Sequence, residues 1–215
     1  MYDFGNTSGH NNYIDFANVS ALEGKSTMSL AAWFEMNAVN DGDRHVFAQF
    51  AGGDGWSMTF SSDEELGVRH DGTNIDADTV YTVDATPHSL VIRTTSGSGS
   101  IVADGSHERD VSGYAPSASS GSTTMRLGTY GQGNGESNAG AACKLGHVMA
   151  WDADIGTSGA TLFHGGATIP NFADLQFWVK CVGTPSSTEA EIGGAVASST
   201  GTITEHVDAV DDYYS

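Results

Sequence analysis

Hydrophobic and polar residues alternate along most of the chain in short runs. The run at 27–36 places Met28, Leu30, Ala32, Phe34 and Met36 on one side, because successive side chains of an extended strand point to opposite faces. Further segments repeat this period: Val46/Ala48/Phe50, Trp56/Met58/Phe60, Leu90/Ile92, Ile101/Ala103, Met125/Leu127, Leu145/His147/Met149/Trp151 and Leu175/Phe177/Val179/Cys181. We therefore expect many short strands, each with one face in a core.

Turn-forming residues separate these segments, among them Asn40-Asp41-Gly42-Asp43 and Asp104-Gly105. Strands that are joined by such short connections are mostly antiparallel. Helical periodicity is weak and confined to residues 155–163. The pattern predicts an all-β fold in which two antiparallel sheets form a sandwich.

The last quarter of the chain differs from the rest in its pattern of amino acids. A strand expected at 173–182 is followed by small and polar residues and then by an acidic, aromatic end. We expect residues 1–166 to form the sandwich. Residues 167–215 should form a C-terminal strand and an extended tail that packs on the sandwich or on a neighbouring subunit. The stretch 112–124 is rich in Ser and Gly, so we expect a surface loop that buries little.

Taken in order, the segments resemble the laminin G-like, or concanavalin A-like, jelly roll. The similar segments are 12–16 (NYIDF), 28–34 (MSLAAWF), 55–60 (GWSMTF), 87–92 (PHSLVI), 101–105 (IVADG), 125–128 (MRLG), 145–151 (LGHVMAW) and 162–166 (LFHGG). Pro87 stands where members of the family usually carry Trp. The resemblance implies a two-sheet antiparallel jelly-roll sandwich with a C-terminal extension.

The C-terminal region resembles the tail of small jelly-roll proteins of tailed bacteriophages. The similar segments are 175–179 (LQFWV), 184–193 (TPSSTEAEIG) and 200–204 (TGTIT). This resemblance implies a virion component that is assembled in the host cytoplasm. Its partners would be other virion proteins of the capsid or tail, or further copies of itself. The N-terminus shows no basic region followed by an apolar run, so we expect no secretory signal.

The charge balance argues against two classes of partner. The chain has 27 acidic residues against 8 Lys plus Arg, a formal net charge of −19. Such a surface repels phosphate groups, so we expect neither nucleic acid nor an anionic membrane as a partner.

No arrangement of residues is typical of an enzyme. No predicted strand carries carboxylates at alternate positions, as related β-glucanases do to place an acid and a nucleophile in one cleft. Cys143 and His147 are better explained as same-face residues of one strand than as a nucleophile and base, and both cysteines, Cys143 and Cys181, as buried free thiols. The histidines, including His45, His70, His88 and His164, lack metal-ligand spacing. We expect no catalytic residue and no required cofactor.

Calcium is the one ion that the sequence suggests. Relatives of the jelly roll bind it at the sandwich rim through hard oxygen ligands. Asn40, Asp41 and Asp43 are the candidate ligands, and a plain acidic turn is the alternative.

Trp33 and Trp178 are predicted on the non-core side of their strands, opposite Phe34 and Phe177. There they could stack on sugar rings, anchor a neighbouring subunit, or be covered by a loop or by the C-terminal tail. Together with Tyr213 and Tyr214 of the tail, they are the candidate ligand or interface residues.

Two functions follow from these expectations. The first is a non-enzymatic bacteriophage virion structural protein, a capsid decoration or tail surface protein on a lectin-like jelly roll. The alternative is a carbohydrate-binding adhesin module that recognises host-surface glycans.

Overall fold

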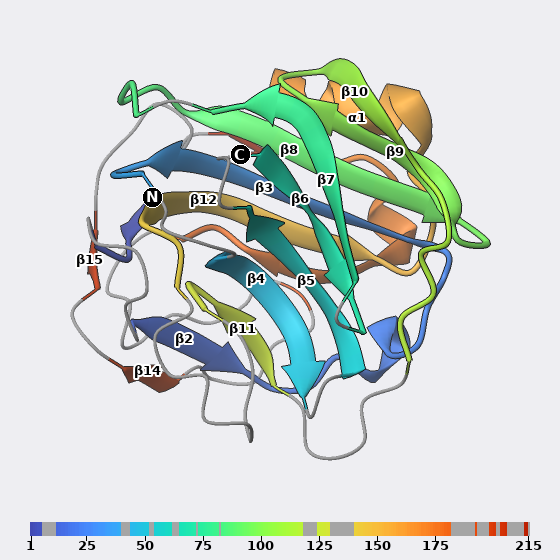
Figure 1. The fold of residues 1–215 in the computed structure, drawn as a ribbon, viewed down its shortest axis with the longest axis horizontal. Coiled ribbons are helices and arrows are strands. Elements are labelled where there is room, and N and C mark those ends of the chain that lie inside the picture. Colours follow the sequence, from blue (N-terminus) through green and yellow to red (C-terminus); the bar gives the residue numbers. More distant parts are fainter. Residues whose placement is uncertain are drawn as a thin grey trace.

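Two antiparallel sheets packed face to face make up the protein (Figure 1). The computed structural model describes residues 1–5, 12–39, 44–51, 54–61, 65–71, 73–81, 83–117, 124–129, 140–181, 192, 198–200, 203–205 and 213–214. The predicted all-β sandwich is confirmed.

The eight-stranded sheet has the order β10-β9-β8-β3-β12-β1-β15, with β13 also paired to β12. Its strands are β1 (Tyr2–Asp3), β3 (Met28–Met36), β8 (His88–Thr95), β9 (Ser98–Ala103), β10 (Ser106–Val111), β12 (Cys143–Trp151), β13 (Leu175–Val179) and β15 (Thr204–Glu205). Neighbours are often distant in sequence, as at β3, which lies between β8 and β12.

The seven-stranded sheet has the order β14-β2-β11-β4-β5-β6-β7. Its strands are β2 (Tyr13–Phe16), β4 (Arg44–Ala51), β5 (Asp54–Phe60), β6 (Glu65–His70), β7 (Thr73–Val80), β11 (Met125–Leu127) and β14 (Ser198–Thr200). Strands from residues 167–215 therefore occur in both sheets.

The main core lies between the two sheets, and β3 shows why it forms. Met28, Leu30, Ala32, Phe34 and Met36 all point into it and are at most 1% exposed, as their alternation predicted. The Phe34 ring meets a Phe ring of β5 edge-on, with centroids 5.4 Å apart. Full burial of a large apolar side chain contributes about 1.5–3 kcal/mol, so this face holds the sheets together.

The alternation expected for β12 breaks at a bulge. Leu145 faces the main core, but the pairing with β3 shifts register between Leu145 and Val148. An extra residue in one strand reverses the side to which the following side chains point. Val148 therefore faces the core, while Met149 and Trp151 face outward. The prediction that both Met149 and Trp151 share the face of Leu145 is wrong for this reason.

A second apolar cluster covers the outer face of the eight-stranded sheet. The helix α1 (Gly156–Gly165) lies behind this sheet (Figure 1) and fits the helical pattern expected at 155–163. It ends at Gly166, whose left-handed conformation (φ 68°) suits glycine. Phe163 of the helix packs with Trp151, Val91 and other outward residues. Short 3-10 turns lie at Ser20–Leu22 and Phe172–Asp174.

Tyr114 corrects the expectation that residues 112–124 bury little. Its side chain is fully buried, and its hydroxyl lies 3.2 Å from the Met28 sulfur. Glycine 97 accommodates this packing, because a Cβ there would come within 2.7 Å of the Tyr114 carbonyl oxygen. Both cysteines are buried free thiols, as predicted.

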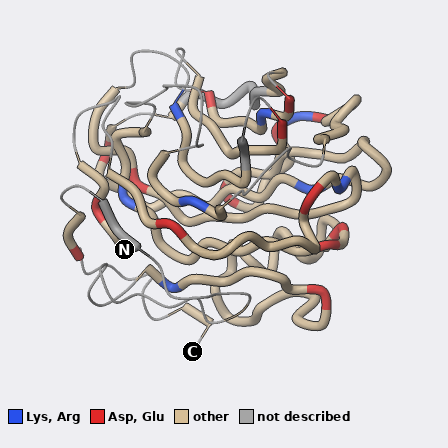
Figure 2. The backbone as a smooth tube through the Cα atoms, turned by 90° about the horizontal axis from the view of Figure 1, so that it is seen from below, with Lys and Arg blue, Asp and Glu red and all other residues tan. Residues whose placement is uncertain are grey.

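Lys and Arg residues are few and dispersed along the described backbone (Figure 2). None of the helices in the described ranges is long and apolar enough to cross a membrane.

Candidate functional site

A polar cluster lies where β8 begins, at one end of the strands of the eight-stranded sheet. The imidazole of His88, the first residue of β8, lies between two carboxylates. Its Nδ1 is 2.8 Å from Asp104 Oδ2, and its Nε2 is 3.4 Å from Asp84 Oδ2. Tyr81 packs against the same imidazole, with ring centroids 5.0 Å apart. We call Tyr81, Asp84, His88 and Asp104 the rim site.

A tight hairpin positions Asp104. Asp104 and Gly105 connect β9 to β10 with positive φ angles of 47° and 75°, which Asp-Gly adopts readily in two-residue hairpin turns. This turn contacts the start of β8. Asp104 Oδ1 accepts a hydrogen bond from the Ser89 backbone N–H (2.9 Å), and the Asp104 N–H donates to the Ser89 carbonyl (2.9 Å). The carboxylate is thus held in a fixed place beside His88.

The Tyr81 hydroxyl is buried and unsatisfied. Tyr81 is 4% exposed, and its ring also meets Phe34 of the main core edge-on. Its Oη has no hydrogen-bond partner within the described part of the chain. Burial raises the pKa of Tyr81, and the negative charges of Asp104 and Glu108 raise it further. The hydroxyl is therefore neutral and can both donate and accept.

His88 and Asp104 each stabilise the charged form of the other. The hydrogen bond to Asp104 raises the pKa of His88, against the effect of burial, and the charges of Asp104 and Asp84 add to it. Burial acts to raise the pKa of Asp104, but hydrogen bonds from His88 and the Ser89 N–H outweigh it and hold this pKa below its usual value. Asp104 is therefore ionised at neutral pH.

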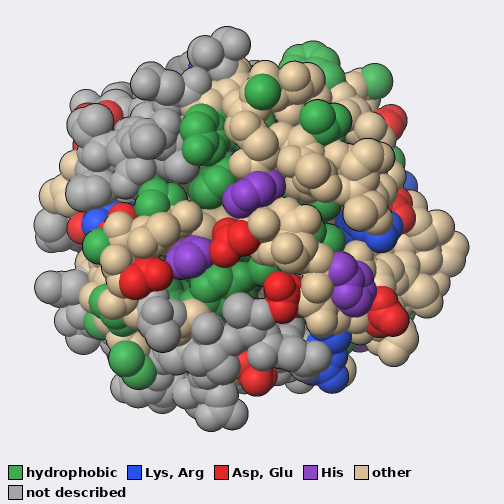
Figure 3. Space-filling view, turned by 90° about the horizontal axis from the view of Figure 1, so that it is seen from above, with side chains coloured by type: hydrophobic (Ala, Val, Ile, Leu, Met, Phe, Trp, Pro, Cys, Tyr) green, Lys and Arg blue, Asp and Glu red, His purple; other side chains and the backbone are tan. Residues whose placement is uncertain are grey.

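The rim site is open to a ligand on its acidic side. The carboxylate side chains of Asp84 and Asp104 are 40% and 42% exposed, whereas His88 is 17% exposed. Val83, beside Asp84, is an exposed apolar side chain. Viewed onto the upper edge of the sandwich, His and acidic side chains lie close together with hydrophobic side chains between them (Figure 3).

The four aromatic residues identified from the sequence come together on the outer face of the eight-stranded sheet, away from the main core. Trp33, Trp178 and Tyr214 belong to the outer apolar cluster, and Tyr213 packs against it. The Trp33 indole N–H donates to the Tyr214 hydroxyl (3.3 Å), which donates to the carbonyl of Phe163. The Tyr213 ring meets Trp33 edge-on at 5.2 Å.

The C-terminal tail covers these tryptophans, which was one of the three alternatives. Trp33 is 4% and Trp178 is 8% exposed. A sugar ring therefore cannot stack on Trp33 while Tyr213 and Tyr214 are in place. His164 of α1 joins this cluster to the rim site, since it stacks on Trp33 and bonds to Ser89 Oγ (2.8 Å).

The calcium candidates Asn40, Asp41 and Asp43 lie outside the described residues. Within the described ranges, no group of three or more His, Cys, Asp or Glu side chains could hold a metal ion.

The outer face of the seven-stranded sheet carries a second polar cluster. Arg126 is 5% exposed, forms a two-pronged ion pair with Asp15 and lies 3.8 Å above the Tyr13 ring. His45 is 1% exposed and lies 3.0 Å from Ser57 Oγ. Burial lowers the pKa of His45 to about 3, helped by two arginines, so it is neutral. Arg126 is thus paired with Asp15, His45 contacts Ser57, and both basic side chains are buried.

The rim site itself was not predicted. His88 appeared as a scattered strand-end histidine, and Asp104-Gly105 as a turn. The residues of the rim site come from a loop, the start of a strand and a hairpin turn. Their spacing in the sequence therefore matches no recognisable motif. The sequence could have indicated the site through segments 87–92 and 101–105. Pairing these two segments as neighbouring strands would have brought His88 close to Asp104.

Residues 7–155 match the family model of the concanavalin A-like lectin/glucanases superfamily (Laminin_G_3). The chain belongs to this superfamily. The two sheets are accordingly those of a concanavalin A-like jelly roll, as the sequence resemblance implied. The rim site lies within the matched residues.

Solved structures share this fold. One is from a Bacteroides ovatus protein described as a candidate carbohydrate-binding protein, with 15% identity and a TM-score of 0.69. It covers 95% of this chain, which spans only 59% of that protein's length. Another is the heptameric SAP-like pentraxin of Limulus polyphemus, with 13% identity and a TM-score of 0.63, covering 98% of this chain and 96% of the pentraxin. Comparison with curated proteins gives no match.

Proposed function

We propose that this chain is a non-catalytic carbohydrate-binding module and that the rim site binds the sugar. The observation that carries the proposal is the buried, unsatisfied Tyr81 hydroxyl beside two exposed carboxylates. Membership of a lectin-containing superfamily and the likeness to the Bacteroides ovatus protein support it.

The chemistry of the rim site suits a polyhydroxylated ligand. A buried polar group without a partner costs free energy that a ligand hydroxyl would recover. Carboxylates accept several hydrogen bonds from neighbouring hydroxyls. The apolar side chain of Val83 stands beside Asp84 and could contact the apolar face of a sugar ring. Such a combination of a few placed polar groups and apolar surface is usual for ligand sites.

The same charges favour binding over catalysis. Glycoside hydrolysis requires a carboxylic acid that holds its proton near neutral pH, which means a raised pKa. Hydrogen bonds from His88 and Ser89 hold the pKa of Asp104 below its usual value despite burial. Asp104 is thus a poor general acid and a good permanent acceptor.

The virion role remains a prediction, since no observation on the described residues bears on it. A glycan-binding adhesin carried on a virion would combine both functions. Self-association also remains a prediction, for which light scattering of the purified protein is the direct measurement.

Calorimetric titration against a panel of neutral and charged oligosaccharides tests the proposal. Asp84→Ala should weaken binding about tenfold, the lower end of the range for one hydrogen bond to a charged group. Asp110→Ala is the matched control, because this carboxylate of β10 is 89% exposed and pairs with His107 instead. Unchanged binding by Asp84→Ala would exclude the rim site, and no binding to any glycan would exclude the function. Loss of binding with a chelator would implicate calcium at Asn40, Asp41 and Asp43.

A further inference from the structure

We infer that the rim site prefers amino sugars, whose amine is protonated, over N-acetylated and acidic sugars. The inference rests on the proposed function and specifies the ligand class. It follows from the number of acceptors and the sign of the charges around the Tyr81 hydroxyl.

Acceptors outnumber donors at the rim site. Among the described residues, Asp84 Oδ1 accepts only the Thr86 N–H (3.0 Å), and its Oδ2 lies 3.4 Å from His88 Nε2. Asp104 accepts from His88 and Ser89. Each carboxylate oxygen has two lone pairs, so acceptor positions remain on both residues. The donors are Tyr81 Oη and His88 Nε2. A ligand rich in donors therefore fits best, and an ammonium group supplies three.

The charges around the rim site also favour a ligand that carries a positive charge. The groups that act most strongly on Tyr81, His88 and Asp104 are Asp84, Asp104, Glu108, His88 and His164, and no lysine or arginine is among them. With both histidines protonated, the three carboxylates of Asp84, Asp104 and Glu108 still outnumber the two imidazolium groups of His88 and His164. A uronate or sialate would add a further negative charge, which like-charge repulsion opposes. N-acetylation of an amino sugar removes the positive charge and two of the donors.

The exposed carboxylates are the place for the cation. Asp84 and Asp104 lie on the two sides of the His88 ring, and both are about two-fifths exposed. In the proposed complex an ammonium group pairs with their exposed oxygens from the solvent side. Tyr81 Oη and His88 Nε2 are buried without a hydrogen-bond partner in the described residues, and a hydroxyl of the same sugar would accept from one of them.

Calorimetric titration with three oligosaccharides of equal length tests the inference: oligomers of glucosamine, N-acetylglucosamine and galacturonic acid. The buffer should be mildly acidic, so that the amine is protonated. Wild-type protein should bind the glucosamine oligomer roughly fivefold more tightly than the N-acetylated one, the upper range for an exposed ion pair. It should bind the galacturonic acid oligomer most weakly.

Two charge-matched variants separate local from general attraction. Asp84→Asn keeps the acceptor for Thr86 and removes one charge at the rim site, so it should abolish most of the preference. Asp110→Asn removes one charge from β10 outside the site, at a position level with Arg93 of β8, and should retain the preference. An equal loss in both variants would show only general attraction by an acidic protein, and would overturn the inference.

The outcomes distinguish the inference from the proposed function. Equal or tighter binding of the N-acetylated or acidic oligomer would overturn the amino-sugar preference and leave the carbohydrate-binding proposal intact. Absence of binding to all three and to the wider glycan panel would overturn both. Tyr81→Phe is a second variant, expected to weaken both the glucosamine and the N-acetylglucosamine oligomer, because the hydroxyl contacts the sugar rather than the amine.

Discussion

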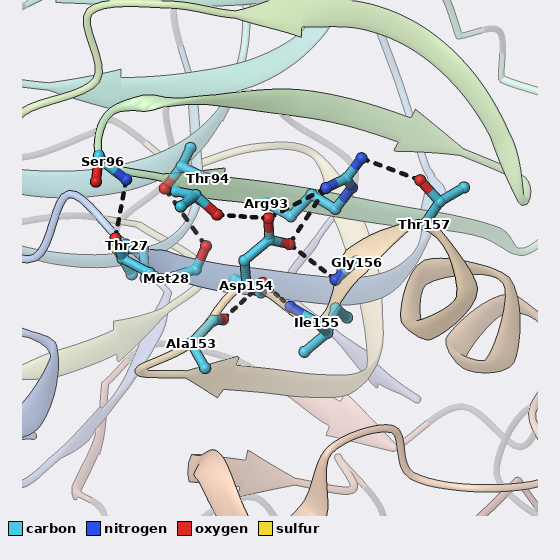
Figure 4. A network of polar contacts seen from close by, with 12 residues as sticks. Thr27, Met28, Arg93, Thr94, Ser96, Ala153, Asp154, Ile155, Gly156 and Thr157 are labelled. Atoms are coloured by element: carbon cyan, nitrogen blue, oxygen red, sulfur yellow. Dashed lines mark hydrogen bonds and ion pairs between the residues drawn. The ribbon is translucent and has the colours of Figure 1, made fainter.

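The two ends of strand β8 both carry polar networks, but they differ in how far their carboxylates are exposed. At the C-terminal end, Arg93 binds Asp154, which precedes helix α1 (Figure 4). Thr95 Oγ1 donates to the same carboxylate. At the N-terminal end, His88 lies between Asp84 and Asp104 beside the unsatisfied Tyr81 hydroxyl. The same strand thus begins in an open acidic site and ends in a closed one.

The network at Asp154 fixes the helix to the sheet. Both carboxylate oxygens of Asp154 accept hydrogen bonds, from Arg93 Nη1, Thr95 Oγ1 (2.7 Å) and the Gly156 N–H (2.8 Å). Arg93 Nη2 also donates to Thr157 Oγ1 (3.0 Å). Burial would raise the pKa of Asp154, but these bonds and the guanidinium charge lower it.

The two ends differ in their carboxylates. Both oxygens of Asp154 have donors from β8 and from the start of α1, and its side chain is 20% exposed. Asp84 and Asp104 are 40% and 42% exposed and retain acceptor positions. A buried group without a partner occurs at both ends, Arg93 Nε at one and Tyr81 Oη at the other. The exposed carboxylates are therefore the reason why we assign binding to the N-terminal end of β8 and stability to the C-terminal end.

The largest expected effect is on stability at the closed end. Asp154→Ala removes the partner of Arg93, and both side chains are only about one-fifth exposed. We expect a loss of about 2 kcal/mol, between the values for exposed and fully buried pairs. Urea unfolding should show a lower midpoint with an unchanged slope.

Asp152→Ala serves as the control for this change, because Asp152 contributes its backbone N–H to Asp174 rather than a side-chain bond to β8. Glycan affinity of folded Asp154→Ala should equal that of the wild type. A change in affinity without a change in stability would reverse the roles assigned to the two ends.

His88 at one end and Asp154 at the other should respond to opposite directions of pH change. The pKa of His88 is raised, so its contribution to stability is complete below its ordinary value of 6.5 and is lost as the pH rises through the raised pKa. The pKa of Asp154 is lowered, so its contribution is complete above its ordinary value of 3.8 and is lost as the pH falls through the lowered one. Asp104 acts in the same direction as Asp154.

Unfolding free energy measured across the pH range therefore gives a curve with two separable limbs. His88→Gln should flatten the alkaline limb, and Asp154→Asn should flatten part of the acid limb. If His88→Gln left the alkaline limb unchanged, the imidazole would not be paired in solution as the structure describes.

The sequence predicted those parts of the fold that depend on local period. The face of β3 from Met28 to Met36 was correct, because it packs on the opposite sheet along its whole length. Beyond Leu145, the face of β12 was wrong at Met149, because a bulge is set by pairing with β3 and leaves no mark in the local pattern. Tyr114 was missed for a similar reason, since its partner Met28 is 86 residues away in the chain.

The candidate site depends still more on contacts distant in sequence. Asp104 lies 16 residues from His88, and the two meet because β8 and β9 pair in a particular register. The aromatic residues Trp33 and Tyr214 were identified by type, but only the tertiary structure shows that one covers the other. Composition indicated the acidic character of the surface and could not locate it.

The smallest expected change in unfolding free energy comes from removing one hydroxyl at each end of β8. It distinguishes the two ends most clearly, because the change should have opposite signs for Tyr81 and Thr95. Tyr81→Phe removes a buried hydroxyl that has no partner in the described structure, so stability should stay equal or rise by up to about 1 kcal/mol. Thr95→Val removes a hydroxyl that donates to Asp154 and should cost about 0.5–1 kcal/mol. Glycan binding should change in the reverse pattern, weakened by Tyr81→Phe and unaffected by Thr95→Val. Chemical denaturation and calorimetric titration on the same preparations measure both. Destabilisation by Tyr81→Phe would mean that the hydroxyl is satisfied in solution, and the rim site would then lose its distinction from the network at Asp154.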